Sequence, residues 1–569
     1  MRKIYFTIII LSLSSGIFAQ TQDSLLRRQM ELERDFTPSL FDADKINSLP
    51  ALHEPAVQKA NTNYSTWAGR TTPPLEIALP APGNIMTAIP YNMKKGFIRF
   101  NAGNYANMDG VFGYRLVEDE KNDFSFTFHH NSTNGDINYL QDVNPAGSNA
   151  YFMDNRGWLG FRHIADALTF NMQLSYLNST FNYYGNTFGD TRFYNNENQR
   201  LGILNAIIGI KSHESDILNY RGEIDFKNFS TRFAETVDTK GIKGTQLNAI
   251  AGFDKPFRGA RSKVGVDGKL FTTFYNGNLD DFTLVNAAPY ITFAGINSSA
   301  RLGADVLFQI SGSTKIRVVP NVKLHWGVTD HSSLYATVHG GIRSNTFPGM
   351  ISESRYIQPY DNVIPSFTLI DFNAGAKIGE VSGFRFDIFA GYKKTDDEHF
   401  LLLNGQDIVD GMATSPYKEV LKPVYGSLSN SHFGGIIQGN IWSPLDFSLR
   451  LKKNFYEVND LTVNDVLIND ARAYNMPGFE VDIRASLDLL SNLNLTLNYY
   501  LAGDRWSYFD GANLKMDNIN DLNVGAVYDI TDAFSVNARV NNLLSQKFDI
   551  WYGHPAQSIN ASGGFTFKF

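Results

Sequence analysis

Strict alternation of apolar and polar residues recurs through most of this chain. Residues 534–541 read Phe-Ser-Val-Asn-Ala-Arg-Val-Asn, so every even position is apolar and every odd one polar. The same period of two occurs at 124–128, 447–452 and 493–498. Successive side chains of a β-strand point to opposite faces, so these segments predict strands whose two faces meet different solvents. A soluble sandwich and a membrane barrel both satisfy this pattern.

The lengths of the links between the predicted strands separate these two folds. Short links at 529–533, 490–493, 443–446, 379–383, 328–332 and 164–167 alternate with long ones at 502–517, 457–478, 393–419, 344–365 and 184–201. A sandwich has no reason to place every long loop at one end, whereas outer-membrane barrels have short periplasmic turns and long external loops. The pattern predicts an all-β protein: one large antiparallel transmembrane β-barrel of about 22 strands over 96–569. The short external link at 311–315 and the broad segment 423–442 fit this pattern least well.

Composition agrees with a barrel wall and excludes several functions. Aromatic residues make up 13% of the chain, and beyond the N-terminus no run of 18 apolar residues predicts a membrane-spanning helix. There are no cysteines, which excludes disulfides, thiolate metal sites and a lipid-anchored N-terminal cysteine. The net charge of -7 is spread thinly and argues against a nucleic-acid partner.

The N-terminal segment has a different character from the rest of the chain. Arg2 and Lys3, the apolar stretch 4–13 and a cleavage point after Ala19 predict a secretory signal peptide at 1–19. An uncleaved anchor helix is the alternative, but the apolar run is too short to span a bilayer comfortably. Residues 20–95 hold eight of the chain's twenty prolines. Proline lacks the ladder donor, so this segment predicts an extended, proline-rich periplasmic arm.

The C-terminal hairpin carries a resemblance to a known family. Asn541-Asn542-Leu543-Leu544, a following loop with Pro555, and a last strand with Phe565, Phe567 and Phe569 resemble the final hairpin of TonB-dependent receptors. The resemblance implies an outer-membrane barrel related to solute uptake. The alternation of the three terminal phenylalanines is also similar to the strand that the barrel-assembly machinery recognises.

The N-terminal segment of the chain differs from the corresponding part of that family. TonB-dependent receptors carry a folded plug domain that fills the lumen, and segment 20–95 is shorter than such a domain. Only residues 30–34 alternate like a TonB box, so coupling to TonB is in doubt. The resemblance therefore implies a receptor-like barrel whose plug is lost or replaced by an arm.

No constellation of residues points to catalysis, so the chain is predicted not to be an enzyme and to need no cofactor or metal. His129 and His130 are adjacent near an apparent strand end, where opposite orientations predict rim positions rather than a site. The run Asp396-Asp397-Glu398-His399 falls in a predicted external loop, where a solvated tip is favoured over a divalent-cation site. Asp280-Asp281 is a weaker candidate of the same kind.

The polar strand faces are expected to line the lumen. A lysine or arginine facing lipid near the midplane would cost roughly 2–4 kcal/mol, so charged residues in the strands should face inward or lie at a membrane edge. Such residues form either a hydrated path or ion-pair networks that fill the interior. A lumen of this width needs some further occupant, since side chains alone cannot fill it. The candidates for the lumen-facing set are Glu223, Asp225, Lys227, Arg385, Asp387, Arg450, Lys452 and Arg539, with Lys568 at the C-terminus.

Two functional hypotheses follow from these patterns. The first is solute passage through the barrel, with the arm gating or occluding the lumen. The second is a non-transporting subunit or scaffold of an outer-membrane complex, in which the arm or the long loops bind other outer-membrane proteins or lipoproteins. Either role places the barrel among outer-membrane lipids and lipopolysaccharide, after biogenesis by the barrel-assembly machinery. Because fold does not determine function, the choice between them needs the geometry of the molecule.

Overall fold

The computed structural model describes residues 94–569, except 138–147, 185–197, 235–239, 258–261, 277–278, 312, 359–362, 382, 404–407, 410–411, 414–419, 443, 464–465 and 510. The predicted signal peptide and nearly all of the predicted arm lie outside the described residues.

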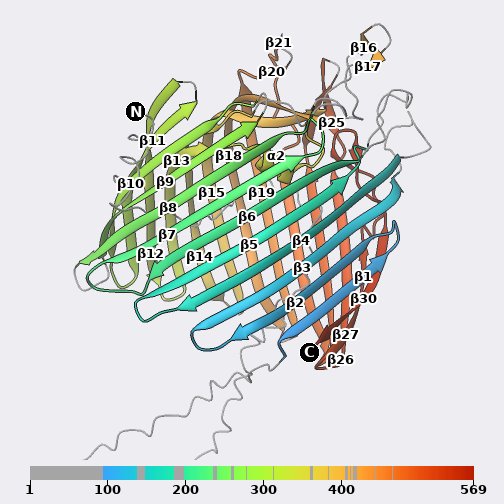
Figure 1. Ribbon diagram of the computed structural model, residues 1–569, viewed down its shortest axis with the longest axis horizontal. Helices are drawn as coiled ribbons and strands as arrows, with labels where there is room; N and C mark the ends of the chain where they lie inside the picture. Colours follow the sequence, from blue (N-terminus) through green and yellow to red (C-terminus); the bar gives the residue numbers. More distant parts are fainter. Residues whose placement is uncertain are drawn as a thin grey trace, which may run out of the picture. The chain divides into compact units, whose positions relative to one another are not determined.

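Twenty-two strands pair edge to edge in a single antiparallel sheet (Figure 1). The predicted strand number is therefore confirmed. The strands are β1 Gly96–Gly103, β2 Met108–Glu118, β3 Asn122–Ile137, β4 Ser148–Ile164, β5 Leu168–Phe181, β6 Gln199–Ser212, β7 Asn219–Thr231, β8 Lys243–Phe257, β9 Ser262–Asn276, β10 Phe282–Ala294, β11 Ser298–Ser311, β12 Ser313–Thr329, β13 Ser332–Arg343, β14 Ser366–Val381, β15 Phe384–Leu403, β18 Leu421–Trp442, β19 Leu445–Asn459, β22 Phe479–Leu490, β23 Leu493–Gly503, β26 Ile519–Thr531, β27 Phe534–Asn541 and β30 Asn560–Lys568.

Smaller elements lie in the long links between these strands. They are the helix α2 Phe347–Glu353 and four short hairpins: β16 Ile408–Val409 with β17 Met412–Ala413, β20 Thr462–Val463 with β21 Val466–Leu467, β24 Arg505–Phe509 with β25 Ala512–Met516, and β28 Asp549–Trp551 with β29 His554–Pro555. Within the described residues, no helix is long and apolar enough to cross a bilayer.

The sheet closes where its first strand meets its last. In β1, Phe97 pairs with Lys568 and Phe100 pairs with Phe565, so β30 completes the ring. On the inner side of this seam, Arg99 is buried and forms an ion pair with Asp109 across 3.0 Å. Closure leaves no edge strand in the sheet, which is a requirement for a sheet surrounded by lipid.

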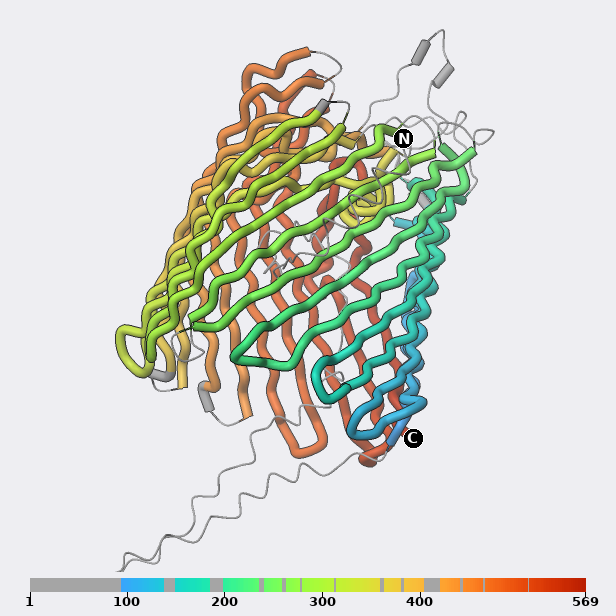
Figure 2. The backbone as a smooth tube through the Cα atoms, turned by 60° about the vertical axis from the view of Figure 1, so that its left-hand side comes forward, coloured from blue at the N-terminus to red at the C-terminus, as the bar shows by residue number. Residues whose placement is uncertain are grey.

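The links sort onto two rims, as the sequence predicts. We call the rim with the tight turns, such as that between β26 and β27, the short-turn rim, and the opposite one, which carries α2, the long-loop rim (Figures 1 and 2). β11 and β12 are joined closely at the long-loop rim, with Ser311 paired to Ser313, so this link is an exception to the pattern. The broad segment 423–442 fits it, because it lies within the single long strand β18. The predicted long link 393–419 is wrong at its start, because β15 continues to Leu403.

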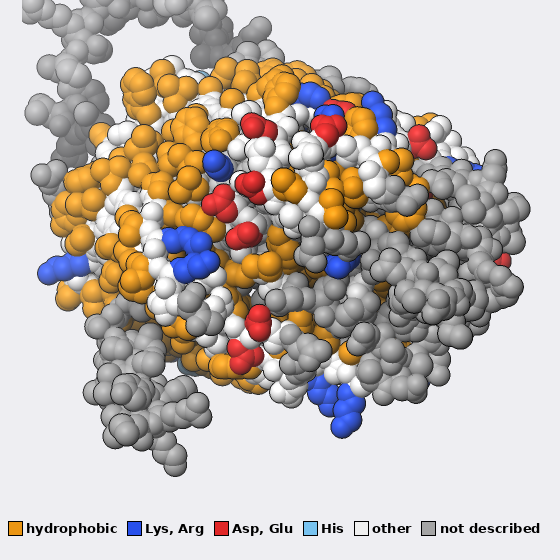
Figure 3. All heavy atoms as spheres, turned by 90° about the horizontal axis from the view of Figure 1, so that it is seen from above, with side chains coloured by type: hydrophobic (Ala, Val, Ile, Leu, Met, Phe, Trp, Pro, Cys, Tyr) orange, Lys and Arg blue, Asp and Glu red, His pale blue; other side chains and the backbone are white. Residues whose placement is uncertain are grey.

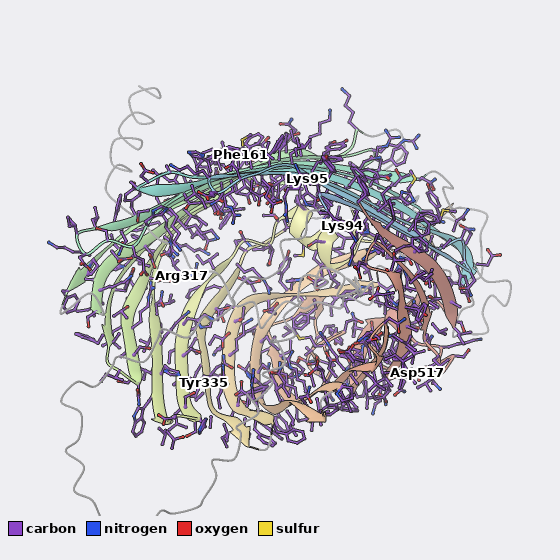
Figure 4. The ribbon with its side chains drawn as sticks, turned by 90° about the horizontal axis from the view of Figure 1, so that it is seen from below. Lys94, Lys95, Phe161, Arg317, Tyr335 and Asp517 are labelled. Atoms are coloured by element: carbon purple, nitrogen blue, oxygen red, sulfur yellow. The ribbon has the colours of Figure 1, made fainter. Side chains whose placement is uncertain are left out.

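The two faces of the wall differ in the way that alternation predicts. Large apolar side chains are exposed on the outer face, for example Ile388 at 61% and Trp326 at 59%. In the view along the barrel, Phe161 lies on the outer side of the wall and Arg317 on the inner side (Figure 4). Phe384 and Phe534 open β15 and β27 directly after short turns, which is where a girdle of aromatic residues is expected.

Candidate functional site

The residues predicted to line the lumen occupy the inner face of the wall. Glu223, Asp225 and Lys227 alternate along β7 with the outward Ile224 and Phe226, which are exposed at 52% and 39%. By register with neighbouring strands, Arg385 and Asp387 of β15, Arg450 and Lys452 of β19, Arg539 of β27 and Lys568 of β30 lie on the same face. They come from three separate sectors of the wall (β7, β15 with β19, and β27 with β30) and do not converge on one site. A conducting role for them stays a prediction.

Some of these inward charges have polar partners along the wall. Asp225 accepts a hydrogen bond from Asn205 at 2.9 Å and lies 3.6 Å from the ammonium of Lys227. Asp387 accepts a hydrogen bond from the hydroxyl of Tyr335 at 2.9 Å and lies 4.0 Å from Lys377. The inner face is thus a mixed-sign, hydrogen-bonded surface.

A more compact site lies inside the ring of strands at the long-loop rim. Residues 344–358, which follow β13 and include α2, lie within the ring (Figure 4). Thr346 caps the helix, since its hydroxyl accepts a hydrogen bond from the Gly349 amide at 3.2 Å, and Pro348 occupies the first turn. Phe347 and Met350 are almost completely buried. We call residues 344–358 the cap.

The cap is held in position by a buried apolar cluster whose residues come from distant parts of the wall. Phe347 and Met350 pack in one buried cluster with residues from β6, β7, β9, β15, β18 and β28 and from the links next to β8 and β9. The backbone amide of Phe347 also donates a hydrogen bond to the hydroxyl of Tyr275 at 3.1 Å. The cluster comprises Leu201, Phe229, Ile242, Tyr275, Leu279, Phe347, Met350, Ile351, Ile357, Leu401, Leu421 and Trp551. Burial of one such side chain stabilises by roughly 1.5–3 kcal/mol, so the cap is strongly favoured in this position.

Buried polar groups tie the base of the cap to β15. Arg343 donates hydrogen bonds to Glu398 at 2.5 Å and to Nδ1 of His399 at 2.9 Å. Because Nδ1 of His399 accepts there, its Nε2 is the nitrogen that donates to Glu353, at 2.6 Å, at the end of α2. Lys393 lies 3.7 Å from the second carboxylate oxygen of Glu398. These contacts hold both ends of the helical segment against one strand.

This arrangement corrects the prediction for residues 396–399. They lie in β15, where a bulge between Thr395 and Glu398 shifts the register, and not in an external loop. Glu398 and His399 are buried rather than solvated. Among the described residues no group of three or more histidine, aspartate or glutamate side chains could hold a metal ion. The oxygen of Asp281 accepts a hydrogen bond from the Tyr275 amide at 2.9 Å, so this weaker candidate supports a turn.

The C-terminal half of the cap is held by aromatic stacking. The ring of Tyr356 stacks on His554 with centroids 4.9 Å apart, and Tyr184 meets both rings edge-on, at 5.0 and 5.6 Å. The adjacent Arg355 forms an ion pair with Asp154 at 3.0 Å and lies over the Phe152 ring. The cap is therefore clamped between β4, the start of the β5–β6 link and the β27–β30 link.

A two-residue backbone contact completes the attachment. Ile357 and Leu421 form an isolated parallel bridge, in which the Leu421 amide donates to Tyr356 at 2.9 Å and the Gln358 amide donates to Leu421 at 2.8 Å. Figure 3 looks onto this rim and shows apolar side chains around acidic and basic ones near its centre. The cap is thus packed against strands from several parts of the ring.

Sequence reasoning assigned no role to the cap. The link 344–365 was expected to be only a long external loop, and the sole local signal was Thr346 followed by Pro348, a helix start inside a loop. His129 and His130 do point to opposite faces, but they lie within β3 and not at a strand end. His129 bonds Asp109 at 2.8 Å, and His130 bonds Asn155 at 2.8 Å.

The β28–β29 hairpin, which supplies His554 to the cap, should be sensitive to pH. Asp549 is buried there and accepts a hydrogen bond from the Gly553 amide at 3.0 Å. Burial raises the pKa of Asp549 to about 6, although the Gly553 amide and the Arg505 guanidinium oppose the shift. A raised carboxyl pKa means that the folded hairpin disfavours ionisation, so its stability falls as pH rises through about 4 to 6.

We expect hydrogen exchange of residues 548–556, corrected for intrinsic rates, to show more protection at pH 5 than at pH 7, by about 1 kcal/mol. Asp549→Asn should remove this dependence while it keeps the hairpin folded. Protection that is equal at the two pH values in the unsubstituted protein would contradict the expectation, as would the same pH dependence in Asp549→Asn.

Comparison with known proteins supports the fold. No family model matches the sequence, and no curated protein does. Solved structures match 84% of this chain: the FrpB iron transporter from Neisseria meningitidis (TM-score 0.63, 10% identity, 82% of its chain) and the siderophore receptor PirA from Acinetobacter baumannii (0.62, 10%, 81%). The copper transporter OprC matches with a TM-score of 0.59 at 11% identity, over 80% of its chain.

These observations define the class of protein. A closed barrel with an apolar outer face and no free sheet edge is an outer-membrane protein, because in lipid every backbone group must be paired internally. Its 22-stranded fold is that of the TonB-dependent receptors, which the C-terminal hairpin resembles. Identities near 10% show the fold alone, and the neighbours are receptors and transporters rather than enzymes.

Proposed function

We propose that this barrel passes a solute across the outer membrane and that the cap gates it from the extracellular side. The observation that carries the proposal is α2, an external-loop helix packed inside the ring of strands. A structural barrel without passage needs no lid within its lumen. Assigning the long-loop rim to the outside follows the rule that outer-membrane barrels have long extracellular loops and short periplasmic turns.

The contacts of the cap suit a gate that opens and closes. Arg343, Glu353, Glu398 and His399 form charged or hydrogen-bonded contacts that can be exchanged for water, and Arg355 adds an ion pair with Asp154. The gate opens only if its open state lies a few kcal/mol above the closed one, so that about 0.1–10% of molecules are open. The predicted arm, residues 20–95, acts in this proposal from the periplasmic side as a second barrier.

Single-channel conductance in a planar bilayer tests the proposal. The mature protein should conduct weakly, and removal of residues 20–93, which stops short of the contact between Lys95 and Arg115, should raise the mean current several-fold. In a second variant a short Gly-Ser linker replaces residues 344–365, which include the cap, because Arg343 and Ser366 are paired neighbours that such a linker can join. Mean conductance should then rise about tenfold or more, since the open fraction is at most about a tenth. Absence of conductance in both deletion variants would contradict the proposal that solute passes through the barrel.

One observation favours the scaffold hypothesis as a second candidate. Strand β21 of the β20–β21 hairpin exposes Val466 at 61% and Leu467 at 54%, on the rim assigned to the outside. Adjacent exposed aliphatic side chains in a rim hairpin suit contact with another protein. Extraction of the native protein in mild detergent tests this candidate. It predicts co-migration with a second outer-membrane protein or lipoprotein, which Val466→Ser/Leu467→Ser should abolish; a lone monomer would exclude it.

A further inference from the structure

Three polar side chains meet on the outer face of the wall, in the half nearer the long-loop rim. His130 and Ser132 lie two residues apart on β3, and Asn155 of β4 is the direct register partner of His130. All three are in phase with outward residues, since Phe128 on β3 is 39% exposed and Phe161 on β4 lies on the outer side of the wall (Figure 4). Sequence spacing could not reveal this group, because one of its members belongs to another strand.

The hydrogen bonds of His130 define which of its ring nitrogens is a base. Nδ1 lies 2.8 Å from Oδ1 of Asn155, and an amide oxygen only accepts, so in the neutral ring Nδ1 carries the proton and donates. Nε2 is then the bare nitrogen, and the hydroxyl of Ser132 donates to it at 3.0 Å. A base within reach of a hydroxyl, itself oriented by a third polar group, is the arrangement that activates serine as a nucleophile.

The depth of this group on the wall matches that of the ester bonds of lipids. Along β3 the outward residues are phenylalanine at 124, 126 and 128 and polar at 130, 132, 134 and 136. Ser132 lies eight residues beyond Phe124, which is roughly 20 Å along the membrane normal for a tilted strand, against an apolar band about 25 Å tall. The group therefore lies at the boundary between acyl chains and head groups of the outer leaflet, where the chains are joined through esters.

The neighbouring residues leave room for a lipid at the serine. Gly110, the register partner of His130 on β2, has no side chain, and a Cβ there would meet other atoms only at 3.7–4.0 Å, an ordinary contact distance. Ser132 is flanked by its register partners Met108 and Met153, of which Met108 is 43% exposed. Apolar side chains beside the hydroxyl suit contact with an acyl chain.

A donor for the negative oxygen of the reaction lies next along the same face of β3. Oδ1 of Asn134 accepts a hydrogen bond from Asn149 at 2.9 Å. This contact orients the side-chain amide of Asn134 and leaves its nitrogen to donate elsewhere. Such a donor can stabilise the oxyanion that forms when a hydroxyl attacks a carbonyl carbon.

We propose that His130, Ser132 and Asn155 hydrolyse fatty-acyl esters of membrane lipids at the outer face of the barrel. Oγ of Ser132 attacks the ester carbonyl carbon while Nε2 of His130 takes the hydroxyl proton. The bond from that carbon to the alcohol oxygen breaks, and His130 gives the proton to the leaving oxygen. Water then attacks the acyl-serine, passes one proton through His130 to Oγ, and releases the fatty acid. Asn155 is a positioning residue that keeps the other proton on Nδ1.

Release of fatty acid from two lipids tests the proposal. The full mature protein is mixed with vesicles of phosphatidylethanolamine or, in a second arm, of lipopolysaccharide, which shows whether the ester belongs to a phospholipid or a glycolipid. We expect release from at least one of them, and a fluorophosphonate probe should be found on Ser132 by mass spectrometry. Ser132→Ala and His130→Ala should each lower release at least about 100-fold, because each removes one partner of the proton transfer.

Variants that stay folded on unheated gels provide the controls. Ser125→Ala removes a hydroxyl from the inner face of the same strand and should leave release unchanged. Asn155→Ala should slow release about tenfold or more, and Asn155→Asp, which keeps an acceptor for Nδ1 of His130, should restore most of the rate. Absence of release from both lipids would overturn the proposal, as would release that Ser132→Ala leaves unchanged. Because the site lies outside the lumen, neither result would bear on passage of solute.

Discussion

Leu449→Arg should prevent most of the protein from assembling into the outer membrane, whereas Arg450→Leu should assemble normally. Leu449 is on the outer face of β19, in phase with Leu451, which is 45% exposed, and it pairs with Ile437 and Ile483. An arginine in lipid near the midplane costs roughly 2–4 kcal/mol, a large part of the stability margin of a folded protein. The fraction that stays folded on unheated gels of isolated outer membranes measures assembly.

Arg450→Leu should be tolerated because Arg450 lies on the inner face of β19, away from lipid. Arg450 lies opposite Asp482, and Asp482 keeps a bidentate partner in Arg484, with hydrogen bonds of 3.1 and 2.8 Å, so the substitution leaves no carboxylate alone. Leu449→Ile is the control for packing at the outer position and should assemble like the unsubstituted chain. If Leu449→Arg assembled and Arg450→Leu did not, the faces of β19 would be the reverse of those described.

The barrel itself could be predicted from the sequence because its rules are local. Alternation such as Phe534, Val536 and Ala538 against Ser535 and Asn537 fixes the face of every residue, and each short turn forces its two strands to pair as neighbours. Strand number, rim assignment and inner-face residues all follow from these two rules. The end of β15 was predicted too early because the acidic pair Asp396-Asp397 is typical of a solvated loop tip. In the structure the strand continues beyond this pair through a bulge between Thr395 and Glu398.

The cap could not be predicted because its contacts join residues far apart in the sequence. Phe347 bonds Tyr275, Tyr356 stacks on His554, and Arg355 reaches Asp154. No periodicity relates such positions, and a helix of this length has too few turns to signal its buried face. Glu398 and His399 were predicted in a loop for a similar reason. A run of charged residues predicts a solvent-exposed position unless its partners, here Arg343 and Glu353, are known.

A disulfide between the cap and the wall should lock the barrel closed. Ile357 and Leu421 are bridge partners, and both are almost completely buried, so their Cα atoms should lie within the range that a disulfide spans. The chain contains no cysteine of its own, so Ile357→Cys/Leu421→Cys can form only this bond within one molecule. If about 0.1–10% of molecules are open at equilibrium, the bond removes that population. Solute flux through the oxidised arm-deleted variant should fall about tenfold or more and recover with dithiothreitol.

Two controls show whether a fall in flux is caused by the disulfide between the cap and the wall. Thr462→Cys/Leu467→Cys places a disulfide of the same kind in the β20–β21 hairpin, whose residues are register partners on the same rim, and it should leave flux unchanged. The single variant Ile357→Cys should conduct alike with and without reductant, which separates cross-linking from loss of packing. Flux that persists in the oxidised double variant would show that solute passes without movement of this segment. The gate would then lie elsewhere, and the buried contacts of Arg343, Tyr356 and Phe347 would stabilise a fixed constriction instead of a lid.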